Sequence, residues 1–364
     1  MAKHFSESFG NPHSAEHSIG WKAAEAVKEA AARVAGLIGA EADEIIFTSG
    51  ATEANNLALL GLGRHAGQSK RRRILISAIE HKCILAVVRI LEEQQGYIAE
   101  TLPVHADGTV DAAALTERLA DDVFVVSIMA VNNEIGTIQD IERLSMAARK
   151  HGAFFHCDAA QAPCAIDLRH ICRYVDLLSL SSHKMYGPQG IGALYIRRGL
   201  QDCVEPLIYG GGQQRNLRSG TLPVALCVGM GVAAELLTAN GAEEERIILH
   251  RRRDAFIRDL MGLGWPIILN GPEGAKRHPG NANLCFEGFE AQDILGVLQP
   301  RLAASTGAAC TSGMPESSHV LRAIGLSDRK AKSSIRFSIG RDTSVADLKE
   351  AVKLVDEAIA KLAG

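Results

Sequence analysis

The sequence lacks the features that would place it in a membrane, in an oxidising compartment or around a metal ion. No apolar run reaches the roughly 20 residues that a membrane-spanning helix needs, and residues 1–6 lack the apolar core of a signal peptide. No two of the eight cysteines are separated by two residues, and the thirteen histidines form no His-Glu-x-x-His motif. We therefore predict a cytoplasmic protein with reduced thiols, no membrane segment and no metal site.

A strong charge of either sign is also missing. The formal net charge is −3, and 47% of the residues are hydrophobic, which is typical of a globular protein. Basic residues gather only in residues 70–73 and 250–253. The first run precedes an expected strand, so we interpret it as a solvated loop. We therefore expect no direct binding to nucleic acid.

The chain of 364 residues is long enough for two domains. In its first part, apolar runs alternate with segments of helical periodicity, which predicts an α/β fold with a mostly parallel, helix-covered sheet. The expected strands are 45–47, 74–79, 123–129, 153–158, 175–180 and 191–196, and the expected helices are 27–38, 53–60, 83–94 and 141–151. This pattern predicts a large domain over residues 10–240.

The pattern changes in the last part of the chain. A helical stretch at 222–261 is broken at 240–241, and a mixed pattern follows. It consists of expected strands at 283–286 and 334–338, an expected helix at 291–298 and a terminal amphipathic helix. We predict a smaller α+β domain over residues 241–364.

A lysine and an acid each come at the end of a buried strand. Lys184 follows the apolar run 175–180 closely, and Asp158 ends the run that starts at 153. A lysine can form a Schiff base with a carbonyl cofactor, and an acid can keep a pyridine nitrogen protonated. A lysine and an acid in this arrangement are typical of proteins that hold pyridoxal phosphate (PLP) and use it as an electron sink. A solvated lysine is the alternative, and the neighbouring motifs favour the cofactor.

A phosphate site is expected beside this pair. Gly50 and Thr52 lie in the turn 48–53 between a strand and a helix, and the free N–H groups of a helix start suit an anion. Ser181 and His183 flank Lys184 and can add donors to the same phosphate. Taken alone, the turn also fits an ordinary capped helix.

Two more polar residues follow expected strands. His81 comes after the strand 74–79, where an imidazole can lie flat on a pyridine ring and pass protons. Asn133 comes after the strand 123–129. Because ligands bind at the carboxyl ends of the strands in open α/β sheets, we expect these motifs to converge on one edge.

Cys310 differs from the other seven cysteines in its surroundings. It lies in the small-residue run 305–313, which cannot form a packed core element. A thiol on a mobile loop can reach a bound substrate and then an acceptor, and a surface thiol with no role is the alternative. Arg336 lies in an expected buried strand and needs an anionic partner there, which a substrate carboxylate would supply in bidentate geometry.

Several motifs together give the chain a family resemblance. They are T-S-G-A-T-E-A-N-N-L-A, E-H-K, V-N-N-E-I-G, H-C-D-A-A-Q, S-S-H-K-M-Y-G-P-Q-G, R-S-G-T-L-P, A-S-T-G-A-A-C-T-S-G and S-S-I-R-F-S-I-G-R. With them the sequence resembles the PLP-dependent cysteine desulfurases, which are class-V aminotransferase-like enzymes. The resemblance runs from about residue 9 to the last helix. It implies a large domain like that of the type I PLP-transferases.

The resemblance implies a role for each residue singled out above and for a few more. Lys184 would attach the cofactor, Asp158 would pair with its pyridine nitrogen, Gln161 would bond its ring hydroxyl, and His81 would stack on its ring. Ala51, Thr52, Ser181 and His183 would bind the phosphate, with Thr221 reaching across from a partner subunit. Asn133, also counted among the cofactor-binding residues, and Arg336 would hold the substrate carboxylate, and Cys310 would be the nucleophile.

The implied function is conversion of L-cysteine to L-alanine, with a persulfide left on Cys310. The resemblance implies a homodimer, and we expect a sulfur-acceptor protein. The loop around Cys310 resembles the long-loop branch of the family and, more faintly, members that supply sulfur for DNA phosphorothioation. Iron–sulfur assembly and tRNA thiolation stay open as destinations of the sulfur.

Two other functions are weighed against this one. The first is a selenocysteine lyase or another aminotransferase-like PLP enzyme. The second is an inactive scaffold or sulfur-carrier partner, because an A-T-T-P-like motif usually precedes the segment at 9–12 in the family and is not found ahead of it here.

Overall fold

The computed structural model describes residues 1–65, 70–306 and 317–364, and it divides into two compact units. Unit 1 comprises Met1–Leu102, Ala112–Ala130 and Asp140–Ala242. Unit 2 comprises Pro103–Asp111, Val131–Gln139 and Glu243–Gly364. The domain boundary at 240/241 stays a prediction, and the structure additionally groups the segments 103–111 and 131–139 with the C-terminal unit.

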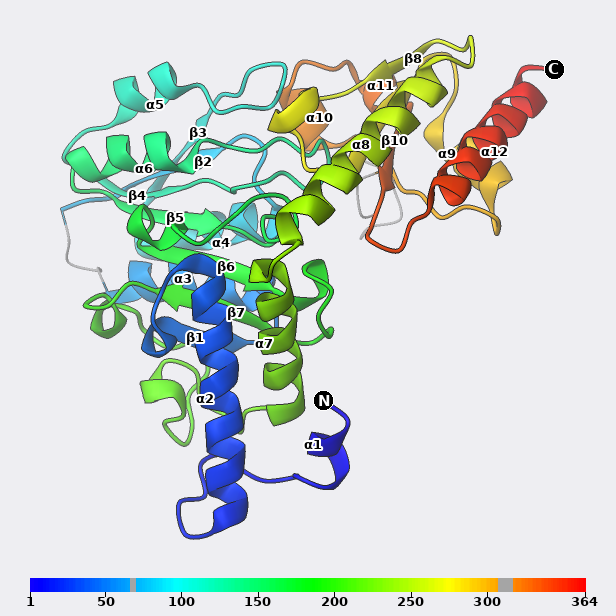
Figure 1. Cartoon of the computed structure of the whole chain (residues 1–364). Helices are drawn as coiled ribbons and strands as arrows, with labels where there is room; N and C mark the ends of the chain where they lie inside the picture. Colours follow the sequence, from blue (N-terminus) through cyan, green and yellow to red (C-terminus); the bar gives the residue numbers. More distant parts are fainter. Residues whose placement is uncertain (66–69, 307–316) are drawn as a thin grey trace. The chain divides into compact units, whose positions relative to one another are not determined.

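Unit 1 is built on a seven-stranded sheet with the order β1-β7-β6-β5-β4-β2-β3 (Figure 1). Its strands are β1 (Ile45–Thr48), β2 (Arg73–Ser77), β3 (Ile98–Leu102), β4 (Val123–Ser127), β5 (Phe154–Asp158), β6 (Leu177–Ser181) and β7 (Gly192–Ile196). The strands from β3 to β6 in this order pair in parallel, whereas β7 runs antiparallel to both β6 and β1. The mostly parallel sheet predicted from the sequence is confirmed.

The antiparallel strand β7 has a direct consequence for the site. Because β1 and β6 both run opposite to β7, they run in the same direction as each other. The carboxyl ends of β1, β2, β4, β5 and β6 therefore all lie at one edge of the sheet. A side-chain carbon on Gly192, the first residue of β7, would lie 2.6 Å from the Cα atom of Gly50. Glycine at this position lets the turn after β1 approach the sheet closely.

Seven helices of unit 1 are described. They are α1 (Lys3–Ser6), α2 (Ser18–Ile38), α3 (Ala51–His65), α4 (Lys82–Gln95), α5 (Ala112–Arg118), α6 (Ile141–Lys150) and α7 (Val224–Thr238). Gly39 and Gly96 end α2 and α4 in the left-handed conformation, with φ of 76° and 70°. Helices α2 and α7 pack along each other (Figure 1), and a side-chain carbon on Gly231 would come within 2.8 Å of the Cα atom of Ala30.

The arginines of the basic run 70–73 are structural. Arg71 donates through Nη1 to the carbonyls of Val123 and His151, both at 2.9 Å. The guanidinium of Arg72 lies 5.2 Å from the centroid of the Tyr97 ring. Arg73 forms ion pairs with Glu100 at 2.5 Å and Asp122 at 2.9 Å. The expectation of a solvated loop was wrong for these three residues, because their side chains connect β2 to its neighbours.

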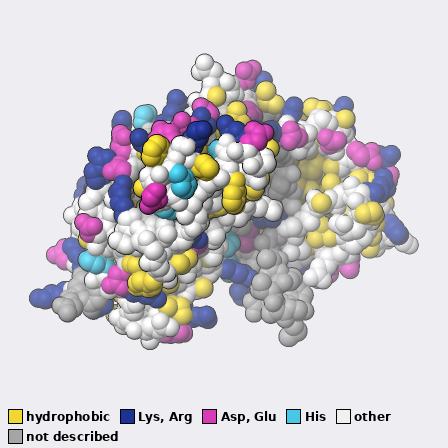
Figure 2. All heavy atoms as spheres, turned by 90° about the horizontal axis from the view of Figure 1, so that it is seen from below, with side chains coloured by type: hydrophobic (Ala, Val, Ile, Leu, Met, Phe, Trp, Pro, Cys, Tyr) yellow, Lys and Arg dark blue, Asp and Glu magenta, His cyan; other side chains and the backbone are white. Residues whose placement is uncertain are grey.

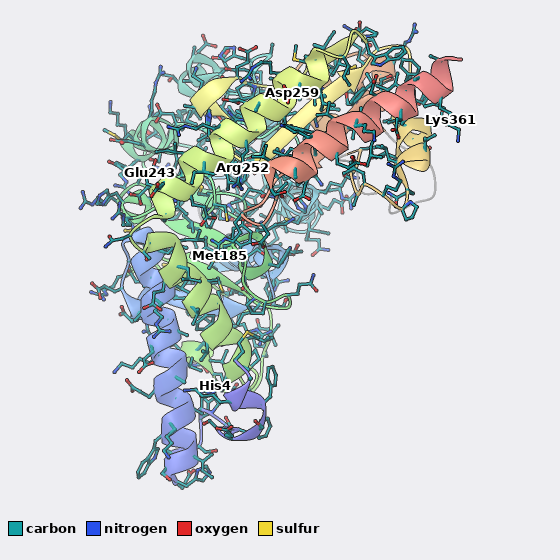
Figure 3. The ribbon with its side chains drawn as sticks, turned by 45° about the vertical axis from the view of Figure 1, so that its right-hand side comes forward. His4, Met185, Glu243, Arg252, Asp259 and Lys361 are labelled. Atoms are coloured by element: carbon teal, nitrogen blue, oxygen red, sulfur yellow. The ribbon has the colours of Figure 1, made fainter. Side chains whose placement is uncertain are left out.

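Unit 2 contains a small antiparallel sheet in the order β10-β9-β8. Its elements are β8 (Ile267–Leu269), β9 (Asn281–Phe286), β10 (Ser334–Ser338), α8 (Ala242–Met261), α9 (Ala291–Leu298), α10 (His319–Ala323), α11 (Asp328–Lys332) and α12 (Val345–Ala363). The rings of Phe256 and Phe286 pack edge-on against Phe337 in its core. Arg252 on α8, labelled in Figure 3, donates to the carbonyl of Thr343 at 2.9 Å and so ties α8 to the segment before α12.

No single described helix is long and apolar enough to cross a membrane, and α7 and α8 meet the length and composition criterion only when taken together. On the face drawn in Figure 2, acidic and basic side chains are interspersed.

Candidate active site

Asp158 ends β5 at the carboxyl edge of the sheet, and its carboxylate is buried. Oδ2 accepts a hydrogen bond from the side-chain amide of Asn55 at 2.8 Å, and Oδ1 accepts one from the backbone N–H of Ala160 at 2.9 Å. Burial raises the pKa of Asp158, and these two hydrogen bonds oppose the rise without cancelling it. A cation beside this carboxylate would favour its ionised form.

Lys184 lies just beyond β6, in the short 3₁₀ turn Ser182–Lys184. Its side chain is exposed, whereas the next residue, Met185, is fully buried and fixes the turn in the core of unit 1 (Figure 3). Beside it, the hydroxyl of Ser181 lies 3.0 Å from Nδ1 of His183. Burial and the neighbouring charge of Lys184 lower the pKa of His183.

The turn after β1 leads directly into α3, whose first residue is Ala51. A side-chain carbon on Gly50 would meet no atom within 4 Å, so the space over the start of α3 is open. Glu53 in the first helical turn accepts the backbone N–H of Ser49 at 2.8 Å and pairs with Arg218 at 2.8 Å. Burial opposes ionisation of Glu53, but the bonds from Arg218 and Ser49 outweigh it and lower the pKa. Arg218 therefore neutralises the acid nearest to the anion site.

His81 caps the N-terminus of α4. Its Nδ1 accepts the backbone N–H of Cys83 at 3.2 Å and lies 3.0 Å from the Cys83 sulfur. The ring is exposed at the edge where β5 and β6 also end. Because β2 and β5 run in the same direction, His81 after β2 and Asp158 at the end of β5 lie at the same edge of the sheet.

Glu80, which precedes His81, is fully buried. Its Oε1 accepts hydrogen bonds from the Ser77 hydroxyl at 2.6 Å and from the Met129 backbone at 2.8 Å. Burial raises the pKa of Glu80 to about 8, and the charge of Asp158 adds to the rise. Glu80 therefore keeps its proton at neutral pH and adds no negative charge beside Asp158.

A second set of predicted residues lies in unit 2. Arg336 on β10 donates through Nη1 to the carbonyl of Asn133 at 3.0 Å and through Nη2 to the Ser305 hydroxyl at 3.3 Å. Its Nε is buried and has no hydrogen-bond partner among the described residues. Burial lowers the pKa of Arg336, and the nearby Glu134 raises it again. A partly buried guanidinium with an unused, buried Nε donor is suited to a carboxylate ligand.

The predicted site residues lie in unit 1 or in unit 2, apart from Cys310. Unit 1 brings the Gly50 turn with Ala51 and Thr52, His81, Asp158, Gln161, Ser181, His183 and Lys184 to the carboxyl edge of its sheet, and Thr221 is exposed after Arg218. Asn133 and Arg336 lie in unit 2, so Asn133 does not share a unit with the other four motifs expected at that edge. Cys310 lies outside the described residues.

Sequence analysis missed three residues around Asp158. Asn55 is buried on α3 and Cys83 lies in the first turn of α4, and both are joined to Asp158 or His81 by hydrogen bonds. Glu80 was noted only as a neighbour of His81. One signal was available: apart from Asn55 and the adjacent Asn56, the helical segment 54–60 is apolar.

The family model for class-V aminotransferases matches residues 1–350 of the chain. The chain belongs to this family. Among its relatives is the cysteine desulfurase IscS of Rickettsia bellii, which is 45% identical over 364 residues. The match covers 100% of this chain and 87% of the relative.

Solved structures agree with this assignment. A NifS-like protein superposes with a TM-score of 0.90 at 31% identity, covering 99% of this class-V chain and 94% of the other. A structure of SspA in complex with cysteine superposes with a TM-score of 0.79 at 36% identity, covering 93% and 92%. The fold is that of the type I PLP-dependent transferases, and the cofactor of this class-V enzyme is PLP.

The residues of unit 1 fit this cofactor. The open space over Gly50 and the start of α3 suits its phosphate. The buried Asp158 carboxylate suits a protonated pyridine nitrogen, because a cation at this point offsets the cost of burial. Lys184 offers the amine that holds the carbonyl carbon. No group of three or more His, Cys, Asp or Glu side chains suited to a metal ion occurs among the described residues.

The raised pKa of Glu80 predicts a particular pH dependence of stability. The folded protein keeps the Glu80 proton up to about pH 8, whereas an unfolded glutamate loses it near its ordinary pKa of 4.5. The native Glu80 therefore reduces stability progressively as the pH rises through this range. We expect Glu80→Gln, which stays neutral, to gain stability relative to the native chain between pH 5 and pH 8. Urea unfolding at both pH values measures the difference, and a difference independent of pH would contradict a protonated Glu80.

Proposed function

We propose that this protein is a cysteine desulfurase, which converts L-cysteine to L-alanine and leaves the sulfur as a persulfide on Cys310. The observation that carries the substrate assignment is the partly buried Arg336, whose Nη1 donates to the Asn133 carbonyl while its buried Nε has no partner among the described residues. An α-carboxylate is the ligand that a fixed, desolvated guanidinium binds best. The names of the IscS relative and of the SspA complex support cysteine as that ligand.

Each residue has a defined task in this proposal. Bound PLP supplies an electron sink for the electrons released at the substrate α-carbon. Lys184 takes the proton from the α-carbon, and Asp158 balances the charge of the protonated ring nitrogen. Arg336 orients the substrate through its carboxylate.

The sulfur transfer balances without any further reactant. The Cys310 thiolate attacks the substrate sulfur, so that a sulfur–sulfur bond forms while the bond between sulfur and the β-carbon breaks. The electron pair of the broken bond stays on carbon, and protonation there completes alanine. L-cysteine and the Cys310 thiol thus give L-alanine and the Cys310 persulfide.

Removal of the nucleophile tests this reaction. We expect Cys310→Ala to bind PLP with unchanged affinity and to lose alanine formation from cysteine at least a hundredfold, because the acceptor of the sulfur is gone. The matched control is Cys285→Ala, which removes a buried thiol of the same unit. Amino-acid analysis of the product provides the measurement. Full alanine formation by Cys310→Ala would refute the proposal, and a keto acid product would indicate an aminotransferase.

The second part of the proposal is a homodimer in which Thr221 completes the phosphate site of the partner subunit. Thr221 is exposed, and it follows a strained turn in which Gln214, Arg215 and Asn216 all have positive φ. Backbone strain of this kind costs about 1–3 kcal/mol per residue and is concentrated at functional segments. Large apolar side chains of unit 1 are also exposed, among them Phe9, Trp21, Tyr209 and Leu236. Such a surface is typical of a protein interface.

Mixed dimers distinguish a shared site from a self-contained one. We expect Thr221→Ala to weaken PLP binding and Lys184→Ala to be inactive. A heterodimer of the two variants, purified through two different tags, then has one site with its own Lys184 and the partner's intact Thr221. About half of the native activity at limiting PLP is expected. If the heterodimer keeps the weakened PLP affinity of Thr221→Ala, or if sedimentation finds a monomer saturated with PLP, the shared site is refuted.

The third part of the proposal is an acceptor protein that collects the persulfide sulfur in the cytoplasm. The net charge of −3, with acidic and basic side chains interspersed on the face drawn in Figure 2, favours a protein acceptor over direct binding of a nucleic acid. We expect contact around residues 303–318, because the acceptor must reach Cys310. When Cys310 is loaded with radiolabelled sulfur and host lysate is added, label should appear first on a protein. Direct labelling of purified DNA or tRNA would contradict this expectation.

A further inference from the structure

One chain of hydrogen bonds joins the two residues that the proposed function assigns to the cofactor ring. It begins at Asp158, whose Oδ2 accepts from the Asn55 amide at 2.8 Å, and the same amide nitrogen lies 3.3 Å from the sulfur of Cys83. That sulfur lies 3.0 Å from Nδ1 of His81. All four residues belong to unit 1, and Asn55 is completely buried.

The direction of the bonds is fixed by Asn55. Its amide nitrogen has two hydrogens, and the two acceptors within reach are the Asp158 carboxylate and the Cys83 sulfur. The reversed amide would set Oδ1 against the carboxylate, where two acceptors repel. In the orientation found, Oδ1 of Asn55 is buried and has no hydrogen-bond partner among the described residues. The hydrogen bond to Asp158 therefore outweighs the cost of leaving this oxygen unsatisfied.

Cys83 continues the chain as a thiol. Burial raises its pKa to about 11, so the sulfur keeps its proton at neutral pH. Because the sulfur already accepts from Asn55, its own hydrogen is available to Nδ1 of His81. The backbone N–H of Cys83 also points to that nitrogen, at 3.2 Å. Both donors point at the single lone pair of Nδ1, which makes Nδ1 the acceptor and places the ring hydrogen on Nε2.

We propose that Asn55 and Cys83 are positioning residues that fix, through this chain, the orientation of the Asp158 carboxylate and the position of the His81 proton. Neither residue is among those assigned to contact the cofactor or substrate. The inference rests on the proposed function for the roles of His81 and Asp158. The geometry that couples them is independent of which substrate is used.

The His81 proton provides a readout that does not depend on turnover. In protein labelled with ¹⁵N histidine, the signals of Nδ1 and Nε2 report the tautomer, and comparison with His81→Gln identifies them. Cys83→Ala removes the thiol beside Nδ1 and keeps the backbone N–H, so we expect it to shift the His81 signals only part of the way toward a mixture of tautomers and to lower kcat about tenfold with little change in KM. Cys83→Ser, which can both accept and donate, should restore both values. Cys227→Ser, which alters a buried thiol on α7, is the matched control.

A second variant tests the other end of the chain. Asn55→Leu has a similar volume and no hydrogen bond to Asp158, and we expect it to weaken PLP binding about tenfold in a fluorescence titration. If circular dichroism shows that Asn55→Leu does not fold, the tautomer and kcat of the Cys83 variants test the proposal instead.

The proposal is overturned if Cys83→Ala keeps the native tautomer and kcat, or if folded Asn55→Leu binds PLP with native affinity. Failure of the proposed function would be recognised separately. In that case Cys310→Ala would still form alanine while the tautomer shift in Cys83→Ala persisted.

Discussion

The burial of one carboxylate determines the arrangement of unit 1. Asp158 ends the central strand β5 in a position that water does not reach, and the cost of burying its charge must be offset locally. The Ala160 backbone and the Asn55 amide offset part of it. The protonated state of the nearby Glu80 prevents a second negative charge from adding to it. The remaining cost favours a cation at the end of the strand, which is the property that a protonated pyridine ring needs.

Strand direction supplies the other components of the site. Since β7 turns back between β6 and β1, the phosphate turn after β1 is brought to the edge where β2, β5 and β6 end. The close approach of Gly192 to Gly50 shows how tightly this turn is packed onto the sheet. Four stretches of sequence that are far apart along the chain thereby contribute to one edge of the sheet.

Much of this could be predicted from the sequence, because the buried strands are almost purely apolar and the polar motifs follow them directly. The parts that were missed have a physical reason. Strand β3 lies at the edge of the sheet and reads Ile-Ala-Glu-Thr-Leu, with most of its side chains partly or fully exposed, so it lacks the apolar signal of the central strands. The three-residue strand β8 is too short to give a periodic pattern.

The same reasoning explains the residues that were missed in the site. The role of Cys83 depends on a contact with Asn55, 28 positions earlier, and no local pattern reveals such a contact. The arginines of 70–73 looked like a solvated run because charge in a sequence says nothing about the partners that neighbouring strands supply, here Glu100 and Asp122. Arg336 was singled out because a charged residue within an apolar strand is itself unusual, and its role stays a prediction.

The ion pair between Arg218 and Glu53 links phosphate binding at the start of α3 to the arrangement of the loop 213–221. Glu53 lies in the first turn of α3, where an uncompensated negative charge would repel a phosphate, and Arg218 comes from the loop that continues to Thr221. Any rearrangement of this loop therefore changes the charge at the phosphate turn, and a bound phosphate in turn favours the loop arrangement in which Glu53 is neutralised. Binding of a phosphate at this turn and the arrangement of the 213–221 loop are therefore thermodynamically coupled, and each favours the other.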